Sequence, residues 1–321
     1  MKIFITHAIP DQGVVLLRNK GYDVAIGDTK SKADLITELG KERYDAVLSD
    51  LNDKIDGEVF AAAGAQCRIF ANYAVGFDNV DLKAAADAGV VITNTPGVLT
   101  DTVAEHAFAL ILAIARRIAE GDRFTRAGKY HGWEPMLLLG TDVSKKTLGI
   151  VGLGRIGSRV AHHAVRGFDM NVMYYDVKRN EEFEKESGAE YHADPDEIFR
   201  TADFVSIHVP LMAATHHLVD ERRLALMKKT AYLINTSRGP VVDETALVSA
   251  LKNGVIRGAA LDVYEHEPAL APGLAELENV VLTPHTASAT EYARQAMSEL
   301  AASNIIEVLE GRPPLNPVQI S

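Results

Sequence analysis

The stretch Thr147-Leu-Gly-Ile-Val-Gly-Leu-Gly-Arg-Ile-Gly157 decides the fold of this chain. Its glycines Gly152, Gly154 and Gly157 have the spacing G-x-G-x-x-G, between an apolar run typical of a strand and a run typical of a helix. In such a turn the first glycine permits a tight bend, the second lets a pyrophosphate approach, and the third lets the helix pack on the sheet. Unpaired amides at the helix N-terminus favour phosphate charge. The stretch therefore predicts a dinucleotide-binding turn.

An acidic residue follows this turn at the expected distance. Asp176 stands nineteen residues after Gly157, at the end of a second strand-like run over residues 171–175. A carboxylate here accepts hydrogen bonds from the ribose hydroxyls of NAD and repels the 2′-phosphate of NADP. Lys178 and Arg179 lie close behind and would tolerate that phosphate. We therefore expect NAD(H) as the preferred cofactor, with NADP(H) possible.

The composition indicates a large acidic globular protein. The chain has 321 residues, 47% of them hydrophobic, so two domains with substantial cores are expected. The net charge of −11 argues against nucleic acid or a membrane surface as a partner. The single cysteine, Cys67, excludes an internal disulfide framework and favours a cytoplasmic location. We expect neither a signal peptide nor a membrane span, because the longest apolar stretch, residues 107–115, is too short to cross a bilayer.

Strand-like and helix-like segments alternate along nearly the whole chain, which indicates parallel sheets covered by helices on both faces. Strands are expected at residues 2–6, 23–26, 46–49, 68–71, 90–93, 204–209, 231–235, 258–263 and 280–283. Helices are expected at residues 11–20, 31–41, 102–117 and 290–309, and an irregular stretch at residues 121–144. Thr100 or Asp101 would cap the helix over residues 102–117.

The central position of the glycine-rich turn predicts a discontinuous α/β fold with two doubly wound parallel sheets. Residues 1–99 plus 287–321 would form a flavodoxin-like substrate-binding domain, and residues 100–286 a Rossmann cofactor domain inserted into it. Ligands of open parallel sheets bind beyond the carboxyl ends of the strands, so chemistry is expected in those loops.

Three of those loops carry residues suited to one reaction. Arg238, Glu267 and His285 each follow the end of a separate predicted strand. An arginine can bind a carboxylate through two parallel hydrogen bonds, and a histidine can exchange a proton with a substrate oxygen near neutral pH. Glu267, if bonded to the other imidazole nitrogen, would orient the ring and favour its protonated form. Beside a nicotinamide the trio predicts a hydroxy-acid dehydrogenase, although its spacing alone fits ordinary surface loops equally well.

The sequence around these residues resembles the D-isomer-specific 2-hydroxyacid dehydrogenases over essentially the whole chain. The resembling stretches are Gly152–Gly157, Ser237-Arg238-Gly239, Asp262-Val-Tyr-Glu-His-Glu-Pro268 and Pro284-His285. Within the family, the chain is most similar to glyoxylate/hydroxypyruvate reductases, also called glycerate dehydrogenases. That likeness rests on Tyr73-Ala-Val-Gly-Phe-Asp-Asn79, Asn94-Thr-Pro-Gly-Val-Leu-Thr-Asp-Thr102 and Gly132-Trp-Glu-Pro135.

The resemblance implies roles for particular residues. It implies that the catalytic residues are Arg238, Glu267 and His285, and that the substrate-binding residues are Leu51, Val75, Gly76, Arg238 and Trp133. The cofactor-binding positions that it implies are Thr102, Gly152, Leu153, Gly154, Arg155, Ile156, Gly157, Asp176, Val209, Pro210, Thr215, Thr236, Ser237, Asp262, His285 and Ala287. Asp262 matches the residue that bonds the nicotinamide carboxamide, and Ala287 departs from the family's usual glycine. Trp133 would reach the partner subunit's pocket, although it equally suits a core aromatic.

The resemblance also implies an activity and an assembly. Small 2-oxo acids, hydroxypyruvate and glyoxylate, would be reduced to D-glycerate and glycolate in a homodimer whose interface includes the helix over residues 102–117 and the loop after it. No metal site is predicted. The adjacent pairs His162-His163 and His216-His217 suit solvated or packed side chains, because neighbours on a helix point in different directions.

Other functions remain open. The chain also suits another D-2-hydroxyacid dehydrogenase, acting on D-lactate-like substrates or 3-phosphoglycerate, or an NAD-sensing binding module similar to the corepressors of this fold. Val75 stands where phosphite dehydrogenases carry a lysine, and Glu267 where formate dehydrogenases carry a glutamine. These two residues argue against phosphite and formate as substrates.

Overall fold

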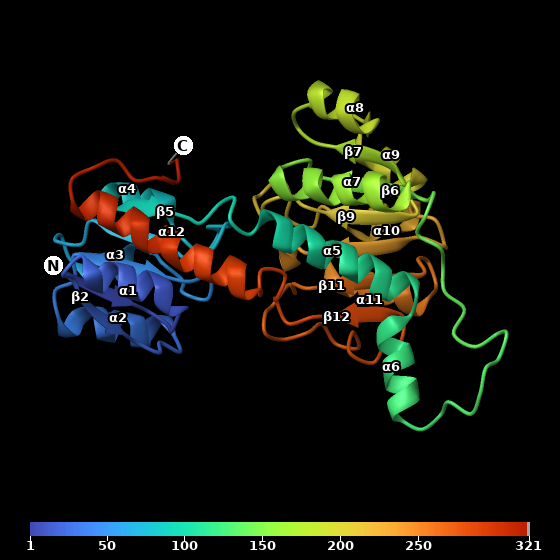
Figure 1. Ribbon diagram of the computed structural model, residues 1–321, viewed down its shortest axis with the longest axis horizontal. Helices are drawn as coiled ribbons and strands as arrows, with labels where there is room; N and C mark the ends of the chain where they lie inside the picture. Colours follow the sequence, from blue (N-terminus) through green and yellow to red (C-terminus); the bar gives the residue numbers. More distant parts are fainter. Residues whose placement is uncertain (320–321) are drawn as a thin grey trace. The chain divides into compact units, whose positions relative to one another are not determined.

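The computed structural model describes residues 1–319, and the chain divides into two compact units (Figure 1). One unit comprises Met1–Leu99 with the C-terminal stretch that begins at Ala289, and the other comprises Thr100–Ser288. The chain re-enters the first unit two residues later than the predicted boundary. The reason is that the Thr286 and Ala287 amides donate hydrogen bonds to Asp262 of the second unit.

The first unit is a five-stranded parallel sheet with the strand order β2-β1-β3-β4-β5. Its strands are β1 (Lys2–Ile5), β2 (Asp23–Ile26), β3 (Ala46–Ser49), β4 (Ile69–Asn72) and β5 (Val91–Thr93). Its helices are α1 (Asp11–Asn19), α2 (Lys32–Lys41), α3 (Gly57–Ala63), α4 (Leu82–Ala88) and α12 (Glu291–Leu309). Helix α1 packs against α12, while α3 packs against both α2 and α4. This order is that of flavodoxin-like sheets, which confirms the predicted fold class.

The second unit is a seven-stranded parallel sheet with the order β12-β11-β10-β9-β6-β7-β8, a Rossmann sheet extended by one strand. Its strands are β6 (Thr147–Val151), β7 (Asn171–Tyr175), β8 (Glu190–Tyr191), β9 (Phe204–Ile207), β10 (Tyr232–Asn235), β11 (Gly258–Leu261) and β12 (Val280–Leu282). Its α-helices are α5 (Thr100–Ala115), α6 (Ile118–Arg126), α7 (Arg155–Phe168), α8 (Glu181–Ser187), α9 (Pro195–Thr201), α10 (Glu221–Leu226) and α11 (Glu244–Lys252).

Helices cover both faces of this second sheet. Tyr232 and Ile234 of β10 belong to the apolar cluster under α5 and α7, whereas Leu233 belongs to the cluster under α9, α10 and α11. Because successive side chains of a strand point to opposite faces, the two clusters lie on opposite sides of the sheet. A strand buried on both faces reads as a continuous apolar run, which is why these strands were predictable.

Two helices differ from the prediction. Helix α5 begins at Thr100, so Thr100 and Asp101 lie inside the helix instead of capping it. Helix α6 occupies part of the stretch predicted to be irregular, and it follows Arg117, whose left-handed φ of 54° breaks the chain direction after α5. None of the α6 residues is buried, so the sequence lacks the apolar periodicity that would predict it.

The topology brings three loops to one sheet edge. Strands β10, β11 and β12 are neighbours, and the register pairs Asn235 with Leu261 and Leu261 with Leu282. The three strands therefore end together, and the loops that follow them carry the three charged residues singled out above.

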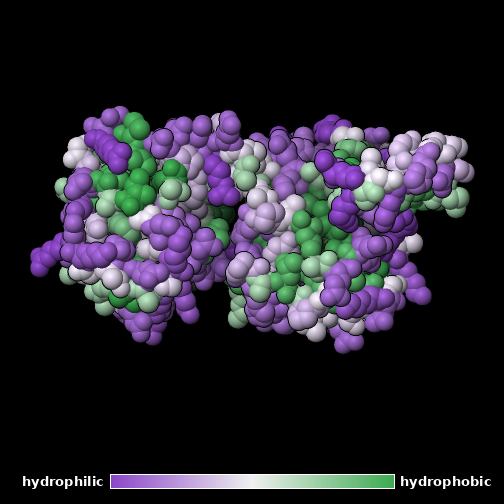
Figure 2. All heavy atoms as spheres, turned by 90° about the horizontal axis from the view of Figure 1, so that it is seen from below, coloured by the Kyte–Doolittle hydropathy of each residue, from purple (hydrophilic) through white to green (hydrophobic). Residues whose placement is uncertain are grey.

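The face shown in Figure 2 is mainly polar, with apolar side chains gathered in patches on each unit. Among residues 1–319, no helix combines the length and the hydropathy needed to cross a membrane.

Candidate active site

The glycine-rich turn leads from β6 into α7. Gly154 is the N-cap of this 14-residue helix and makes no side-chain cap hydrogen bond, so the first amides of α7 point out of its N-terminus. An added methyl group on Gly157 would collide with the Gly152 carbonyl oxygen, which explains the need for glycine there. On Gly154 it would meet no atom within 4 Å, so the turn is open where a ligand would approach. This open backbone cradle fits a pyrophosphate.

Asp176 lies just after β7, next to this turn. Its carboxylate accepts hydrogen bonds from the Leu153 amide at 2.7 Å and from the Lys178 amide at 3.1 Å. The Arg179 guanidinium bonds both oxygens of Glu184, at 2.9 Å and 2.7 Å. With the Tyr174 hydroxyl it lowers the pKa of Glu184 to about 2, so Arg179 is paired with a full negative charge. This arrangement favours NAD(H), whose ribose hydroxyls can donate to Asp176.

The remaining predicted cofactor positions also belong to the second unit. They are Thr102 on α5, Leu153 in the turn, Arg155 and Ile156 at the start of α7, Val209, Pro210 and Thr215 after β9, and Thr236 and Ser237 after β10. The Thr215 hydroxyl donates to the Pro210 carbonyl at 2.6 Å. The Thr236 hydroxyl is buried and has no hydrogen-bond partner within residues 1–319. An unsatisfied buried hydroxyl costs about 1–3 kcal/mol, which a cofactor atom would offset.

Asp262 follows β11, is fully buried and holds the loop after β12. Its carboxylate accepts hydrogen bonds from the Thr283 hydroxyl at 2.6 Å, the Thr286 amide at 2.9 Å and the Ala287 amide at 2.8 Å. Burial alone would raise the pKa of Asp262, but these bonds and one from His106 keep it below its ordinary value. Ala287 is itself buried with its amide bonded, so the departure from glycine is accommodated.

His285 and Glu267 are hydrogen bonded, with His285 Nδ1 2.9 Å from Glu267 Oε2. His285 has a left-handed φ of 52°, and its amide donates to the carbonyls of Asp262 and Thr283, which fixes the direction of the ring. Glu267 Oε1 accepts the Tyr264 amide at 2.9 Å. Burial would raise the pKa of Glu267, but the bonds from His285 and Tyr264 hold it below its ordinary value. Since Nδ1 is engaged, a proton for a substrate would come from Nε2.

Arg238 follows β10 in a turn that a buried asparagine braces. Asn235 Oδ1 accepts the Ser237 amide at 3.0 Å and the Ser237 hydroxyl at 2.8 Å, while its Nδ2 donates to the Arg238 carbonyl at 2.9 Å. The Arg238 guanidinium donates to the Ser237 carbonyl at 2.9 Å. The backbone that presents the guanidinium is therefore fixed from the strand end itself.

The predicted substrate positions Leu51, Val75 and Gly76 lie in the first unit, after β3 and β4. The Asn94 side chain donates to the Val75 carbonyl at 2.7 Å, and the Asn72 side chain donates to the Gly76 carbonyl at 3.0 Å. In the part of the chain that the structure describes, the Val75 and Gly76 amides have no protein acceptor. These two amides can therefore bind an anion.

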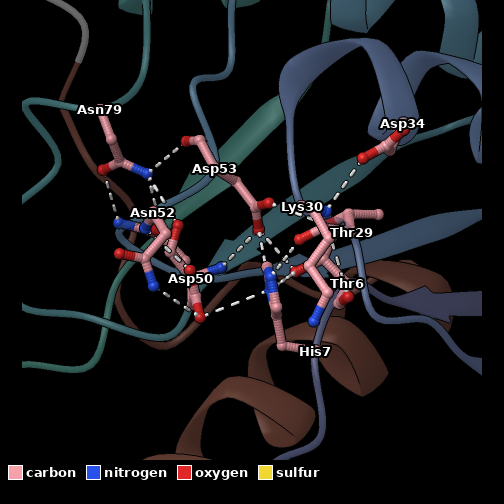
Figure 3. A network of polar contacts seen from close by, with 10 residues as sticks. Thr6, His7, Thr29, Lys30, Asp34, Asp50, Asn52, Asp53 and Asn79 are labelled. Carbon is pink, nitrogen blue, oxygen red and sulfur yellow. Dashed lines mark hydrogen bonds and ion pairs between the residues drawn. The ribbon is translucent and has the colours of Figure 1, made fainter. Parts of the chain in front are cut away.

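Leu51 lies in a turn that a network centred on Asp53 holds (Figure 3). Asp53 Oδ2 accepts the Asp50 amide at 3.0 Å and the Thr6 hydroxyl at 2.5 Å. The Asn79 side chain donates to the Asp50 and Asp53 carbonyls, both at 3.0 Å. Sequence reasoning missed this network, although Thr6 and Asp53 follow β1 and β3, which flank the point where the strand order reverses.

Trp133 lies in the stretch between α6 and β6, which Figure 1 shows as an extended arm of the second unit. Its side chain is 83% exposed. The alternative that it is a core aromatic of this chain is therefore wrong.

Two groups of side chains have ligand atoms close enough to hold a metal: His216, His217 and Glu265, and His7, Asp50 and Asp53. The expectation that His216 and His217 point apart is wrong, because His217 has a left-handed φ of 50° and the two rings stack at 4.1 Å. His217 Nε2 donates to Glu265 at 2.6 Å. In the second group, His7 Nδ1 lies 3.4 Å from Asp50 Oδ2 and 3.7 Å from Asp53 Oδ2 (Figure 3). The absence of a metal stays a prediction.

A family model described as D-isomer specific 2-hydroxyacid dehydrogenase, NAD binding domain, matches residues 108–287. The chain belongs to this family. The match confirms the resemblance read from the sequence and makes the protein an oxidoreductase that uses NAD or NADP.

Relatives within the family extend over nearly the whole chain. The chain is 49% identical to a glyoxylate reductase of Korarchaeum cryptofilum, over 99% of this chain and 95% of that protein. It is 48% identical to a glyoxylate reductase of Pyrococcus horikoshii, over 98% and 94%.

Solved structures agree with the fold. The TT0316 protein of Thermus thermophilus matches with a TM-score of 0.92 and 41% identity, over 99% of this chain and 100% of that chain. A NADPH-dependent glyoxylate/hydroxypyruvate reductase of Sinorhizobium meliloti, in complex with NADP and malonate, matches with a TM-score of 0.88 and 31% identity, over 99% and 96%. These matches confirm the two-sheet architecture of the family.

Proposed function

We propose that this dehydrogenase reduces glyoxylate and hydroxypyruvate to glycolate and D-glycerate, with NADH as the preferred hydride donor. The hydrogen bond between Glu267 and His285 carries the proposal, because carbonyl reduction needs a proton donor, and the bond to Nδ1 orients the ring and leaves Nε2 to supply that proton. The similarity to glyoxylate reductases supports the choice of acids. NAD(H), when bound, supplies the hydride.

Residues of the chain bind the substrate and supply the proton. Arg238 binds the substrate carboxylate with its planar fork of donors. As charge develops on the carbonyl oxygen, His285 Nε2 donates its proton to that oxygen, and Glu267 keeps the ring oriented. Leu51, Val75 and Gly76 stay proposed substrate contacts, and Asp262 and Asp176 stay proposed cofactor contacts.

A steady-state panel tests this function. NADH oxidation should be fastest with glyoxylate and hydroxypyruvate and slower with pyruvate or a bulkier 2-oxo acid, and NADH should give a higher kcat/KM than NADPH. Replacing Asp176 with alanine should reduce the ratio of kcat/KM for NADH to kcat/KM for NADPH, because it removes the charge that repels a 2′-phosphate. A preference for pyruvate would support the D-lactate alternative. Absence of turnover with every acid would support the NAD-sensing binding module.

We also propose a homodimer. The arm between α6 and β6 exposes Trp133 and Met136, and a hollow between α5 and α7 is lined by Phe108, Leu112 and Phe168. Exposed tryptophan and methionine side chains such as these are enriched in protein interfaces. The cytoplasmic location stays a prediction from the cysteine usage.

Light scattering coupled to gel filtration tests the assembly. The wild type should have a mass of twice 34.8 kDa, and replacing Trp133 and Met136 together with serine should shift it toward the monomer. Tyr292→Ser is the matched control, because this aromatic residue on α12 is also exposed but lies outside the arm. A wild type that elutes as a monomer would contradict the homodimer.

A further inference from the structure

A buried carboxylate closes the loop that carries Glu267. Glu244, the first residue of α11, is only 3% exposed. Its Oε1 accepts the Glu265 amide at 2.8 Å, and its Oε2 accepts the Ala271 amide at 3.3 Å. These amides stand on either side of Glu267 in the chain. One side chain therefore ties both ends of the loop together.

Neighbouring loops brace the same arrangement. The Glu265 carboxylate accepts the Glu244 amide at 3.3 Å through one oxygen and His217 Nε2 at 2.6 Å through the other. An added methyl group on Gly239 would collide with the Tyr264 carbonyl, so the turn after β10 packs directly on the start of this loop. The loop that carries Glu267 is therefore contacted by two further segments, one after β9 with His217 and one after β10 with Gly239.

The carboxylate of Glu244 is not needed to cap its own helix. Asp243 is the N-cap of α11 and accepts the Ala246 amide at 2.9 Å. Burying a carboxylate is unfavourable, and burial raises the pKa of Glu244 even though the Glu265 and Ala271 amides oppose this. Both Glu244 oxygens instead bond to the loop that carries Glu267.

We propose that Glu244 is a positioning residue for proton transfer: by clamping the two ends of the loop, it keeps Glu267 at hydrogen-bond distance from Nδ1 of His285. This inference rests on the proposed function, in which these two residues deliver the proton. Glu244 itself does not touch the reacting atoms. Glu244 keeps Glu267 and His285 aligned. A displacement of catalytic groups by about 1 Å can lower the rate about 100-fold.

The variant Glu244→Gln tests the clamp, because it keeps the size of the side chain and replaces one acceptor oxygen with an amide that cannot accept. We expect kcat for glyoxylate reduction to fall about 10–100-fold while the dissociation constant for NADH, followed by fluorescence, stays unchanged. KM for glyoxylate should change little, because Asn235 holds the turn that presents Arg238. A fall in kcat without a matching rise in KM distinguishes misaligned proton transfer from general damage to the site.

Asp243→Ala is the matched control. It removes the cap of the same helix, so it should lower the melting temperature while kcat and KM for glyoxylate stay those of the wild type. His217→Asn, whose side chain is too short to reach Glu265 and which tolerates the left-handed backbone at this position, should give a smaller loss of kcat without touching Glu244. A wild-type kcat in Glu244→Gln would overturn the proposal, and so would equal losses of kcat in Glu244→Gln and Asp243→Ala.

Hydrogen exchange separates this inference from the proposed function. In Glu244→Gln, exchange at the Glu265 and Ala271 amides should accelerate, whether or not the enzyme turns over glyoxylate. Faster exchange in Glu244→Gln, combined with a wild type that reduces no 2-oxo acid, would contradict the proposed function and leave the clamp in place. If exchange at these amides is the same in Glu244→Gln and in the wild type, and the wild type reduces glyoxylate, the clamp is contradicted and the proposed function stands.

Discussion

Replacing His285 with asparagine should lower kcat for glyoxylate reduction by about 10²–10⁴-fold and leave the affinity for NADH unchanged. His285 has a left-handed backbone, which asparagine tolerates better than alanine, so the substitution removes the proton donor with little added strain. The ring of His285 is the proton donor of the proposed reaction, and its Nδ1 is already bonded to Glu267. Steady-state rates and fluorescence titration with NADH measure the two quantities separately.

The companion variant Glu267→Gln should give a smaller loss. Glutamine can still accept a hydrogen bond from Nδ1 and orient the ring, so this substitution removes the charge of the carboxylate and keeps most of the positioning. A loss of kcat below tenfold in His285→Asn would show that another group or solvent delivers the proton. The assignment of the pair would then be wrong.

Replacing Arg238 with lysine should reduce kcat/KM for glyoxylate by about 10²–10³-fold. Truncating one partner of a desolvated charge pair costs about 2–5 kcal/mol, and about 1.4 kcal/mol corresponds to a factor of ten. Lysine keeps the charge but cannot form two parallel hydrogen bonds to a carboxylate. Both KM and kcat should suffer, because the clamp also sets the position of the carbonyl.

Arg222→Lys is the control for this substitution. Arg222 lies on α10 and pairs with Asp196, so its replacement should leave kcat/KM unchanged. Equal values of kcat/KM for Arg238→Lys and the wild type would show that other groups of the protein bind the substrate carboxylate.

Much of the fold follows from local patterns. Strands such as β3 and β10 are buried on both faces, so they appear in the sequence as short uninterrupted apolar runs. The glycine spacing of the cofactor turn is equally local. Arg238, Glu267 and His285 could be singled out because parallel strands end at one edge, where their loops meet.

The supporting residues could not be predicted, because their partners are distant in the chain. Glu244 reads as an ordinary acidic residue in the first turn of a helix, and only the folded structure brings it to amides 21 and 27 residues later. Asp53 reads as a turn residue, although its carboxylate accepts the Thr6 hydroxyl from 47 residues earlier in the chain. Helix α6 has no buried face, so neither its existence nor the exposure of Trp133 left a periodic signal.

The close contact between Gly239 and the Tyr264 carbonyl limits which substitutions can change the substrate preference of this enzyme. The turn after β10 and the loop that starts at Tyr264 touch backbone to backbone, so any mutation that shifts one shifts the other. In the proposed reaction, carboxylate binding by Arg238 and the orientation of His285 by Glu267 therefore depend on one backbone contact. Leu51 is held by an independent network in the other unit. We therefore expect that substitutions in the Leu51 turn can change which acids are accepted, with little effect on the chemical step.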